Sequence, residues 1–424
     1  MHPVPGGGRR ADPPSSPDPS GFTPGERRQL AGLALTALPF AVVLFGGLGR
    51  ENPLVVAAVT GLAIVAASMY LAWAVEALEG VVSQAVALAV LALIEVAPEY
   101  SFSVILAWQQ RSDLVISSMT GSNRLLLGLG WPVILFLAWL GARRRRQPFD
   151  GIRLSRHQAV EILFLLIASA YAFVIVLRGS VTLLDSLLLT ALFAAYVLAA
   201  LRMPPGDEAG EPAAGIGGKV RALPPLPRAL AVGGFLLFGA FVIFFGAEPF
   251  IDGVIGVAKN FGISQFFLIQ WVAPFLSEFP ESLTAFLWAA TVVHAPRAMA
   301  NLVSSKLNQW TLLIASIPAA YSLSLGRPAA MPLSGLGQEE LLLTAAQSLL
   351  GVLLLTELHF SKLEAVLLLA LFTVQFVLPL EPVRLVIAGV YLALAAVFLL
   401  RRLLGASLFG ELARALASLS PQRR

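Results

Sequence analysis

Two long apolar segments of the chain, residues 94–124 and 276–306, each carry two glutamates within about one helical turn of each other. A carboxylate in the middle of a membrane-spanning helix is costly to bury, so such residues are functional candidates from the start. A repeated pair of them is typical of transporters whose binding site lies between two repeats. The chemistry available to such residues is the binding of a cation or a proton. The four acids are Glu95, Glu99, Glu278 and Glu281.

Other oxygen-bearing residues follow these acids at helical spacing. Residues three or four apart share one face of a helix, which places Ser103 beside Glu99. Carboxylates, hydroxyls and carbonyls are the ligands that hard cations such as Ca²⁺ select. Pro98 and Pro280 would each free a backbone carbonyl one turn upstream, because a proline lacks the N–H that would bond to it. The remaining candidate metal ligands are Ser122, Asn123, Ser277, Thr284, Ser304 and Asn308.

The composition indicates which class of protein carries these segments. Apolar residues make up 57% of the 424 residues and charged residues only 13%, whereas soluble domains carry about 25% charged residues. Several apolar runs reach the roughly 20 residues that cross a bilayer as a helix. Backbone groups in lipid must bond to one another, so these runs predict an all-α, polytopic transmembrane bundle. The chain has no cysteine, which excludes disulfides and thiolate metal sites, and a formal charge of +4 gives no indication of nucleic-acid binding.

Apolar runs and loop composition predict about twelve transmembrane helices. They are expected at 30–48, 53–78, 82–109, 114–140, 158–177, 181–201, 229–257, 264–293, 299–325, 338–357, 361–379 and 383–402. Lengths near 30 residues predict tilt or a break, and Pro98 and Pro280 supply a reason for a break in the third and eighth helices. A Pro-, Gly- and Ser-rich tail at 1–29 is expected to be disordered. The rest divides into an extra helix at 30–52, a first repeat at 53–201, a cytoplasmic linker at 202–228, a second repeat at 229–379, and an extra helix with a tail at 380–424.

The run of arginines from Arg143 to Arg146 marks one loop as cytoplasmic, because lysine and arginine are concentrated in cytoplasmic loops. Counting spans outward from this loop places both termini in the cytoplasm. The helix that carries Glu99 then crosses the membrane in the direction opposite to the helix that carries Glu281. The two five-helix repeats are therefore expected to be inverted, an arrangement that brings two half-sites together near mid-membrane.

These features resemble the cation/calcium exchanger superfamily, of which sodium/calcium exchangers are the familiar members. The hallmark of that family is a pair of inverted repeats, each with a G-T-S-x-P-E helix and a helix that starts with G-S-N. The chain matches this pattern at Pro98-Glu99 and Gly121-Ser122-Asn123 in the first repeat, and at Pro280-Glu281, Ser304 and Asn308 in the second. The resemblance implies a membrane antiporter that binds a cation between Glu99 and Glu281.

The sequence departs from that family around the Pro-Glu pairs. Where the family has a threonine and then a serine, the first repeat has Glu95 and Val96, and the second has Ser277 and Glu278. Two bases, Arg124 and Lys306, also stand where the family usually has an apolar residue. Because an unpaired buried charge is costly, we expect Arg124 and Lys306 to pair with the added acids Glu95 and Glu278. The alternative is that both bases extend to the membrane interface.

The sequence therefore predicts an integral cell-membrane antiporter, and not an enzyme, that exchanges Ca²⁺ against Na⁺ or H⁺ by alternating access. Its expected partners are inorganic cations and the lipid bilayer, with no nucleic acid and no cofactor. A desolvated carboxylate takes up a proton readily, which favours H⁺ as the counter-ion, and the altered threonine and serine positions weaken the case for Na⁺. The alternatives are a monovalent cation/H⁺ exchanger, a membrane-embedded enzyme, and a family member that does not transport.

Overall fold

The computed structural model describes residues 21–47, 51–78, 97–203 and 215–404, together with 410, 413–414 and 417. Helices make up nearly all of it. The helices of the N-terminal part are α1 (Pro24–Leu35), α2 (Ala37–Gly46), α3 (Pro53–Leu78), α6 (Ala97–Trp108), α7 (Ser112–Leu125), the π-helix η2 (Leu126–Gly130), α8 (Trp131–Arg144), α9 (Gln158–Arg178) and α10 (Leu183–Leu201). Those of the C-terminal part are α11 (Ile216–Arg221), α12 (Pro225–Phe261), α13 (Gln265–Ala290), α14 (Ala295–Asn308), the π-helix η3 (Gln309–Leu313), α15 (Ile314–Ser324), α16 (Gly335–Leu355), α17 (Lys362–Val377) and α18 (Glu381–Leu404).

Eight helices within these ranges are long and apolar enough to cross a membrane. Each predicted helix overlaps a helix of the structure, although the third does so only through α6, because residues 79–96 lie outside the described part. Large apolar side chains such as Leu177 and Leu363 are 88% and 78% exposed. A surface of this kind is suited to lipid. The prediction of an all-α membrane bundle is confirmed.

The two halves of the bundle repeat the same elements in the same order. Helices α7 and α14 have 14 residues each, and each continues through a five-residue π-helix into another α-helix. Packing between the halves also comes in matched pairs: α7 packs on α16 as α14 packs on α9, and α8 packs on α13 as α15 packs on α6. Such reciprocal contacts are those of an approximate two-fold axis, in agreement with inverted repeats. Each residue of α7 therefore has a counterpart in α14, with Ser112 matching Ala295.

Two short antiparallel sheets tie the halves together. Strand β1 (Gly151–Arg153) pairs with β4 (His359–Ser361), and β2 (Ser180–Val181) pairs with β3 (Met331–Pro332). Each sheet takes one strand from the first half and one from the second. The same two-fold relation exchanges the two sheets, because β1 and β3 follow equivalent helices in their halves.

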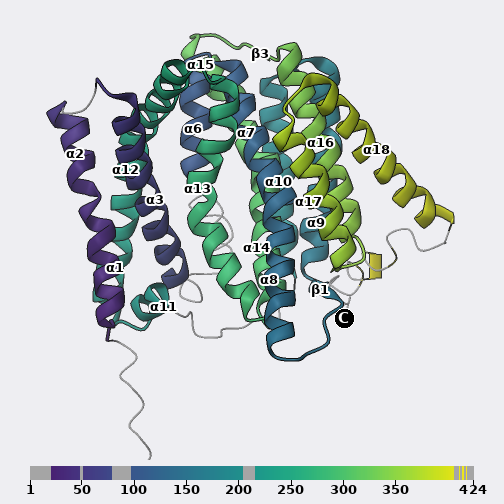
Figure 1. Ribbon diagram of the computed structural model, residues 1–424, viewed down its shortest axis with the longest axis horizontal. Helices are drawn as coiled ribbons and strands as arrows, with labels where there is room; N and C mark the ends of the chain where they lie inside the picture. Colours follow the sequence, from purple (N-terminus) through teal and green to yellow (C-terminus); the bar gives the residue numbers. More distant parts are fainter. Residues whose placement is uncertain are drawn as a thin grey trace, which may run out of the picture.

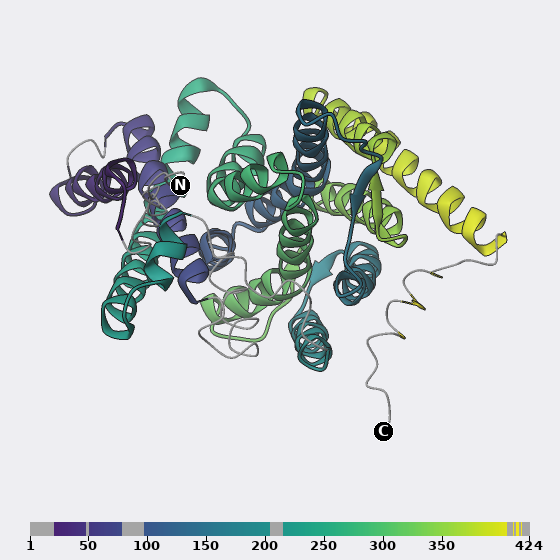
Figure 2. The ribbon, with the colours of Figure 1, turned by 90° about the horizontal axis from the view of Figure 1, so that it is seen from below.

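Helices α1, α2, α3, α11 and α12 form one side of the molecule, and α18 lies on the opposite side (Figure 1). The view from below shows the same separation (Figure 2). Helices α3 and α12 pack mainly against each other, and two small apolar clusters lie among α1, α2, α3, α11 and α12, apart from much of the large core. Close packing of α3 on α12 depends on small residues: a Cβ added at Gly253 would lie 2.7 Å from the backbone nitrogen of Ala57.

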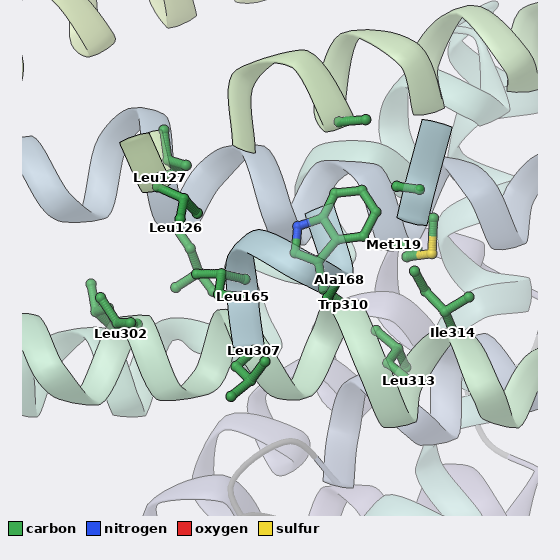
Figure 3. Packing of buried hydrophobic residues seen from close by; sticks show 14 of the residues in the cluster. Met119, Leu126, Leu127, Leu165, Ala168, Leu302, Leu307, Trp310, Leu313 and Ile314 are labelled. Carbon is green, nitrogen blue, oxygen red and sulfur yellow. The ribbon is translucent and has the colours of Figure 1, made fainter. Parts of the chain in front are cut away.

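The large core spans α6 to α10 and α13 to α18, and it also includes Ile64 of α3 and residues of α12 between Ala247 and Ile255. Trp310 of η3 is at its centre and is 1% exposed. Figure 3 shows its ring among side chains from both halves, including Leu126, Leu165 and Leu313. Its indole N–H donates to the hydroxyl of Ser348 on α16 at 3.0 Å. The hydrogen bond thereby holds the π-helix against α16 of the same half, while the ring packs against side chains of the first half.

The structure corrects the expectation of a break at Pro280. Helix α13 runs without interruption from Gln265 to Ala290, so this proline removes one backbone hydrogen bond without ending the helix. Pro98 is the second described residue of α6, and because residues 79–96 lie outside the described part, the expected break at Pro98 stays a prediction. The irregular backbone lies instead in η2 and η3, where π-type turns interrupt the α-helical pattern. Turns of this kind occur often at functional sites.

Candidate functional site

Two buried carboxylates, one from each repeat, share a single amide donor. Glu99 on α6 and Glu278 on α13 are each 4% exposed. The side-chain amide of Gln309, the first residue of η3, donates to Glu278 Oε1 at 2.9 Å and to Glu99 Oε2 at 3.3 Å. The hydroxyl of Ser277 donates to Glu99 Oε1 at 3.3 Å. The predicted carboxylates Glu99 and Glu278 are therefore brought together, within reach of one amide group.

Three buried oxygens of this region have no hydrogen-bond partner within the described ranges. They are the hydroxyls of Ser103 and Ser122, each 1% exposed, and Oε1 of Gln309, which is fully buried. Ser103 lies one helical turn beyond Glu99 on α6. Buried polar groups are nearly always bonded, so each of these three unmet acceptors is a candidate ligand for a cation or a water molecule.

Helix α7 reaches this region through a close approach to α13. A Cβ added at Gly121 would lie 1.8 Å from the carbonyl oxygen of Gln270, so no other residue fits there. The next residues, Ser122 and Asn123, are consequently held deep in the bundle, each 1% exposed. Asn123 donates its side-chain amide to the carbonyl of Met119 at 3.1 Å and leaves its oxygens to accept. The glycine of the G-S-N pattern thus sets the depth at which the two polar residues lie.

Lys306 occupies the position in α14 that Asn123 occupies in α7. Its Nζ is fully buried and donates to the carbonyl oxygen of Asn123 at 3.0 Å and to Asn123 Oδ1 at 3.1 Å. The alternative in which the two bases extend to the membrane interface is wrong, since Arg124 is 1% exposed and Lys306 is buried completely. The expected interaction of Lys306 with Glu278 stays a prediction.

Arg124 forms an ion pair that the sequence did not indicate. Its guanidinium Nη2 lies 2.5 Å from Glu340 Oε2 on α16, and both side chains are buried. Arg384 on α18 contacts the same acid at 3.5 Å and Glu339 at 2.9 Å. The expectation that Arg124 pairs with an acid of the Pro-Glu repeat is therefore corrected: its ion-pair partner in the described part of the chain is Glu340.

Neutral side chains complete this second polar cluster. Gln375 on α17 accepts from Arg124 at 3.1 Å, and Gln270 on α13 donates to Glu340 at 2.9 Å. The guanidinium also lies 5.1 Å from the centre of the Trp271 ring. Arg124 thus connects α7 with α13, α16 and α17, and through Glu340 with α18, so its structural role is to join helices from both repeats.

Several predicted site residues lie elsewhere or outside the described part. Glu95 is among the undescribed residues, and of Glu281 only its place in α13 is described. Thr284 is half-buried one turn further along α13. Asn308 is 4% exposed and is the last residue of α14. Within the described ranges, no three acidic, histidine or cysteine side chains gather closely enough to hold a metal.

Ser304 corrects the expected register of the second repeat. The expectation paired it with Ser122, but α7 and α14 superpose so that Ser304 matches Gly121 and Ser305 matches Ser122. The hydroxyl of Ser304 donates to Glu161 on α9 at 3.2 Å, and Tyr196 donates to the same oxygen at 3.0 Å. Ser304 therefore bonds to α9 and not to the carboxylate pair.

The residue that sequence reasoning missed in this site is Gln309. Its signal was present, because a second amide directly follows Asn308 in an otherwise apolar stretch. Glu340 and Arg384 were not among the residues that the sequence singled out, and both lie near the start of a predicted helix, 338–357 and 383–402. A charged residue beside a long apolar run is ambiguous until the burial of that helix end is known.

The comparisons with known proteins agree with this geometry. The model of the sodium/calcium exchanger protein family matches residues 52–202 and 231–380. Among solved structures, the chain is similar to the H⁺/Ca²⁺ exchanger CAX, at 33% sequence identity and a TM-score of 0.84, over 93% of this chain and 98% of that one. The comparison with curated proteins gave no match.

Two more distant structures share the fold. The Ca²⁺/H⁺ antiporter protein YfkE is 18% identical, with a TM-score of 0.60 over 86% of this chain and 99% of that one. The sodium-calcium exchanger NCX_Mj is 19% identical, with a TM-score of 0.51 over 75% and 96% of the two chains. The matched regions of the family model contain both inverted repeats, with Glu99 in the first and Glu278 in the second, so this chain belongs to the sodium/calcium exchanger family of membrane cation exchangers.

Proposed function

We propose that this chain exchanges Ca²⁺ for H⁺ across a membrane, at a site between Glu99 and Glu278. The observation that carries the proposal is the amide of Gln309, which bonds to one buried carboxylate from each repeat. Two carboxylates that converge in a water-excluded position form a site for a divalent cation or for protons. The likeness to an H⁺/Ca²⁺ exchanger at 33% identity supports the choice of these two ions.

The proposed Ca²⁺ ligands are oxygens from both repeats. Ca²⁺ takes six to eight oxygens from carboxylates, carbonyls, hydroxyls and water. The pair of carboxylates supplies the charge, and the hydroxyls of Ser103 and Ser122 and Oε1 of Gln309 are buried acceptors without partners in the described part of the chain. Glu281, Glu95, Asn123, Ser277, Thr284 and Asn308 remain ligands proposed from the sequence alone.

Protons are the counter-ion that these carboxylates suit best. When Ca²⁺ leaves, two carboxylates that share one amide repel each other, and protonation of the pair relieves the repulsion. When Ca²⁺ returns, the protons leave to the same aqueous side from which the metal enters. Na⁺ would be expected to use the family's hydroxyl positions, and two of these are Glu95 and Glu278 in this chain.

Alternating access needs one group of helices to move against another. We assign the movement to α3 and α12, because they pack mainly on each other and are surrounded by small apolar clusters of their own. The remaining helices carry the site and make up most of the large core, which α12 contacts through residues such as Phe250 and Ile251. The predicted orientation, with both termini in the cytoplasm, belongs to this proposal.

The test is uptake of ⁴⁵Ca²⁺ into proteoliposomes under an imposed H⁺ gradient or an imposed Na⁺ gradient. We expect uptake with the vesicle interior acidic and none with the Na⁺ gradient. Glu99→Gln and Glu278→Gln should abolish uptake, and Glu281→Gln tests the ligand proposed from sequence. Glu381→Gln is the matched control, since Glu381 is exposed in the first turn of α18. Uptake retained in both Glu99→Gln and Glu278→Gln would contradict the proposed site, and Na⁺-driven uptake would contradict the counter-ion.

A further inference from the structure

Lys306 is a cation enclosed entirely by protein and held on oxygens of the opposite repeat. Its ammonium bonds to the carbonyl oxygen and to Oδ1 of Asn123, at 3.0 and 3.1 Å. It also lies 5.8 Å from the centre of the Trp310 ring, a position that favours a positive charge. Carbonyl and amide oxygens are ligands of alkali and alkaline-earth cations as well as acceptors for an ammonium.

Among the described residues, Lys306 is also the buried base that remains to offset the site carboxylates. Arg124 and Arg384 face Glu340 and Glu339, and this group of two bases and two acids balances its own charge. Lys306, in contrast, is three residues before Gln309 and therefore on the same side of the helix. Gln309 bonds to both Glu99 and Glu278. One ammonium group thus accompanies two described carboxylates.

Comparison of the two repeats shows that Lys306 departs from the internal symmetry. At the equivalent position the first repeat has Asn123, whose uncharged side chain offers an oxygen. The second repeat replaces that neutral side chain by an ammonium group, directly after Ser305, the counterpart of Ser122. A position that could present an oxygen to an ion instead presents a positive charge.

We infer that Lys306 is a specificity-determining residue whose ammonium takes the place of a monovalent cation beside Asn123. The inference rests on the proposed function, because it concerns the same site. A lysine side chain is covalently held and cannot leave the site as a free monovalent cation would, and its two oxygen acceptors and the Trp310 ring favour the ammonium form. The site then accepts Ca²⁺ without an accompanying Na⁺ or K⁺, since the charge that such an ion would bring is already present.

Equilibrium binding of ²²Na⁺ to the purified full-length chain tests this inference. Lys306→Asn restores the residue of the other repeat, Lys306→Gln is a second neutral variant, and Lys306→Arg keeps the charge. Lys259→Met removes an exposed lysine from the end of α12 and is the matched control. We expect both neutral variants to bind Na⁺ about tenfold or more tightly than the wild type, because a nearby desolvated charge has been removed. Lys306→Arg and Lys259→Met should bind Na⁺ as the wild type does.

The outcomes separate this inference from the proposed function. Neutral variants that fold and bind no more ²²Na⁺ than the wild type would overturn the resident-cation role. Failure of both neutral variants to fold while Lys306→Arg folds would also overturn it, since the lysine would then be a structural charge. Wild-type protein that binds no ⁴⁵Ca²⁺ would overturn the proposed function, and the ²²Na⁺ comparison would still decide the role of Lys306.

Discussion

Asn123, Arg124 and Leu126 of the first repeat correspond to Lys306, Leu307 and Gln309 of the second. In the described part of the chain, each repeat therefore buries one base, but at different positions and with different partners. Arg124 pairs with an acid outside the carboxylate pair, whereas Lys306 bonds to neutral oxygens of Asn123. Gln309, whose amide bonds to both carboxylates, also corresponds to the apolar Leu126 of the first repeat. The backbone of this exchanger is nearly symmetric, and the polar chemistry of its site comes from the places where the symmetry fails.

Removal of Glu340 should have the largest effect, because it leaves Arg124 buried beside a second arginine. We expect Glu340→Gln to lower the free energy of unfolding by about 3–5 kcal/mol. Glu339→Gln, which removes the more exposed acid of the same cluster, should cost about 0–1 kcal/mol. Thermal unfolding in detergent measures both. Equal losses for the two variants would mean that Arg124 does not depend on Glu340.

Gly121→Ala tests the close approach that only the first repeat contains. The added Cβ would meet the backbone of Gln270 at 1.8 Å, so α7 and α13 must separate. We expect a loss of about 1–3 kcal/mol in the free energy of unfolding and reduced transport. Gly233→Ala on α12 is the control, because a Cβ there meets nothing within 4 Å. If Gly121→Ala is as stable as that control, the helices have room that the geometry does not indicate.

Gln309→Leu gives the second repeat the residue of the first. It removes the amide that bonds to both carboxylates and an oxygen proposed as a Ca²⁺ ligand. We expect the Kd for Ca²⁺ to rise by about tenfold or more, equivalent to about 1.4 kcal/mol. Binding of ⁴⁵Ca²⁺ to purified protein measures this, with Gln338→Leu on α16 as the control. An unchanged Kd would show that the carboxylates keep their arrangement without the amide.

Ser122→Ala and Ser304→Ala should produce the smallest effects. We expect the first to change Ca²⁺ binding and the second to change stability. Ser122 has a buried hydroxyl with no partner in the described residues, so its loss should weaken Ca²⁺ binding and leave stability nearly unchanged. Ser304 donates to Glu161, so its loss should cost about 1 kcal/mol of stability and leave Ca²⁺ binding unchanged. Measurement of the Kd and the unfolding temperature for each variant separates the two roles. The reverse pattern would restore the register that the sequence first suggested.

Most of the fold could be predicted from the sequence because lipid allows few alternatives. Long apolar runs indicate the helices, and a Pro-Glu pair that occurs twice indicates two repeats. The carboxylates Glu99 and Glu278 were also predictable, since acids within such runs are rare. The pattern of Arg143 to Arg146 supports an orientation that stays a prediction.

The structural features that could not be predicted depend on geometry that does not appear as a periodic pattern in the sequence. The π-helices η2 and η3 change the face on which the following residues lie, and an apolar pattern does not reveal them. The connection from Pro280 to α14 is one residue longer than that from Pro98 to α7, which shifts the register of Ser304. The partners of Arg124 come from helices distant in sequence, so spacing along α7 contains no information about them.

The two short sheets have a consequence for how the protein is made. A chain that emerges from the ribosome contains β1 and β2 long before β4 and β3, the strands with which they pair. Until then, each early strand presents unpaired backbone groups, and an edge of this kind is prone to pair wrongly. Neither half can complete its hydrogen bonding alone. Final assembly must therefore wait until synthesis has passed Ser361. A chain that stops at the linker would lack β3 and β4, the strands with which β2 and β1 pair.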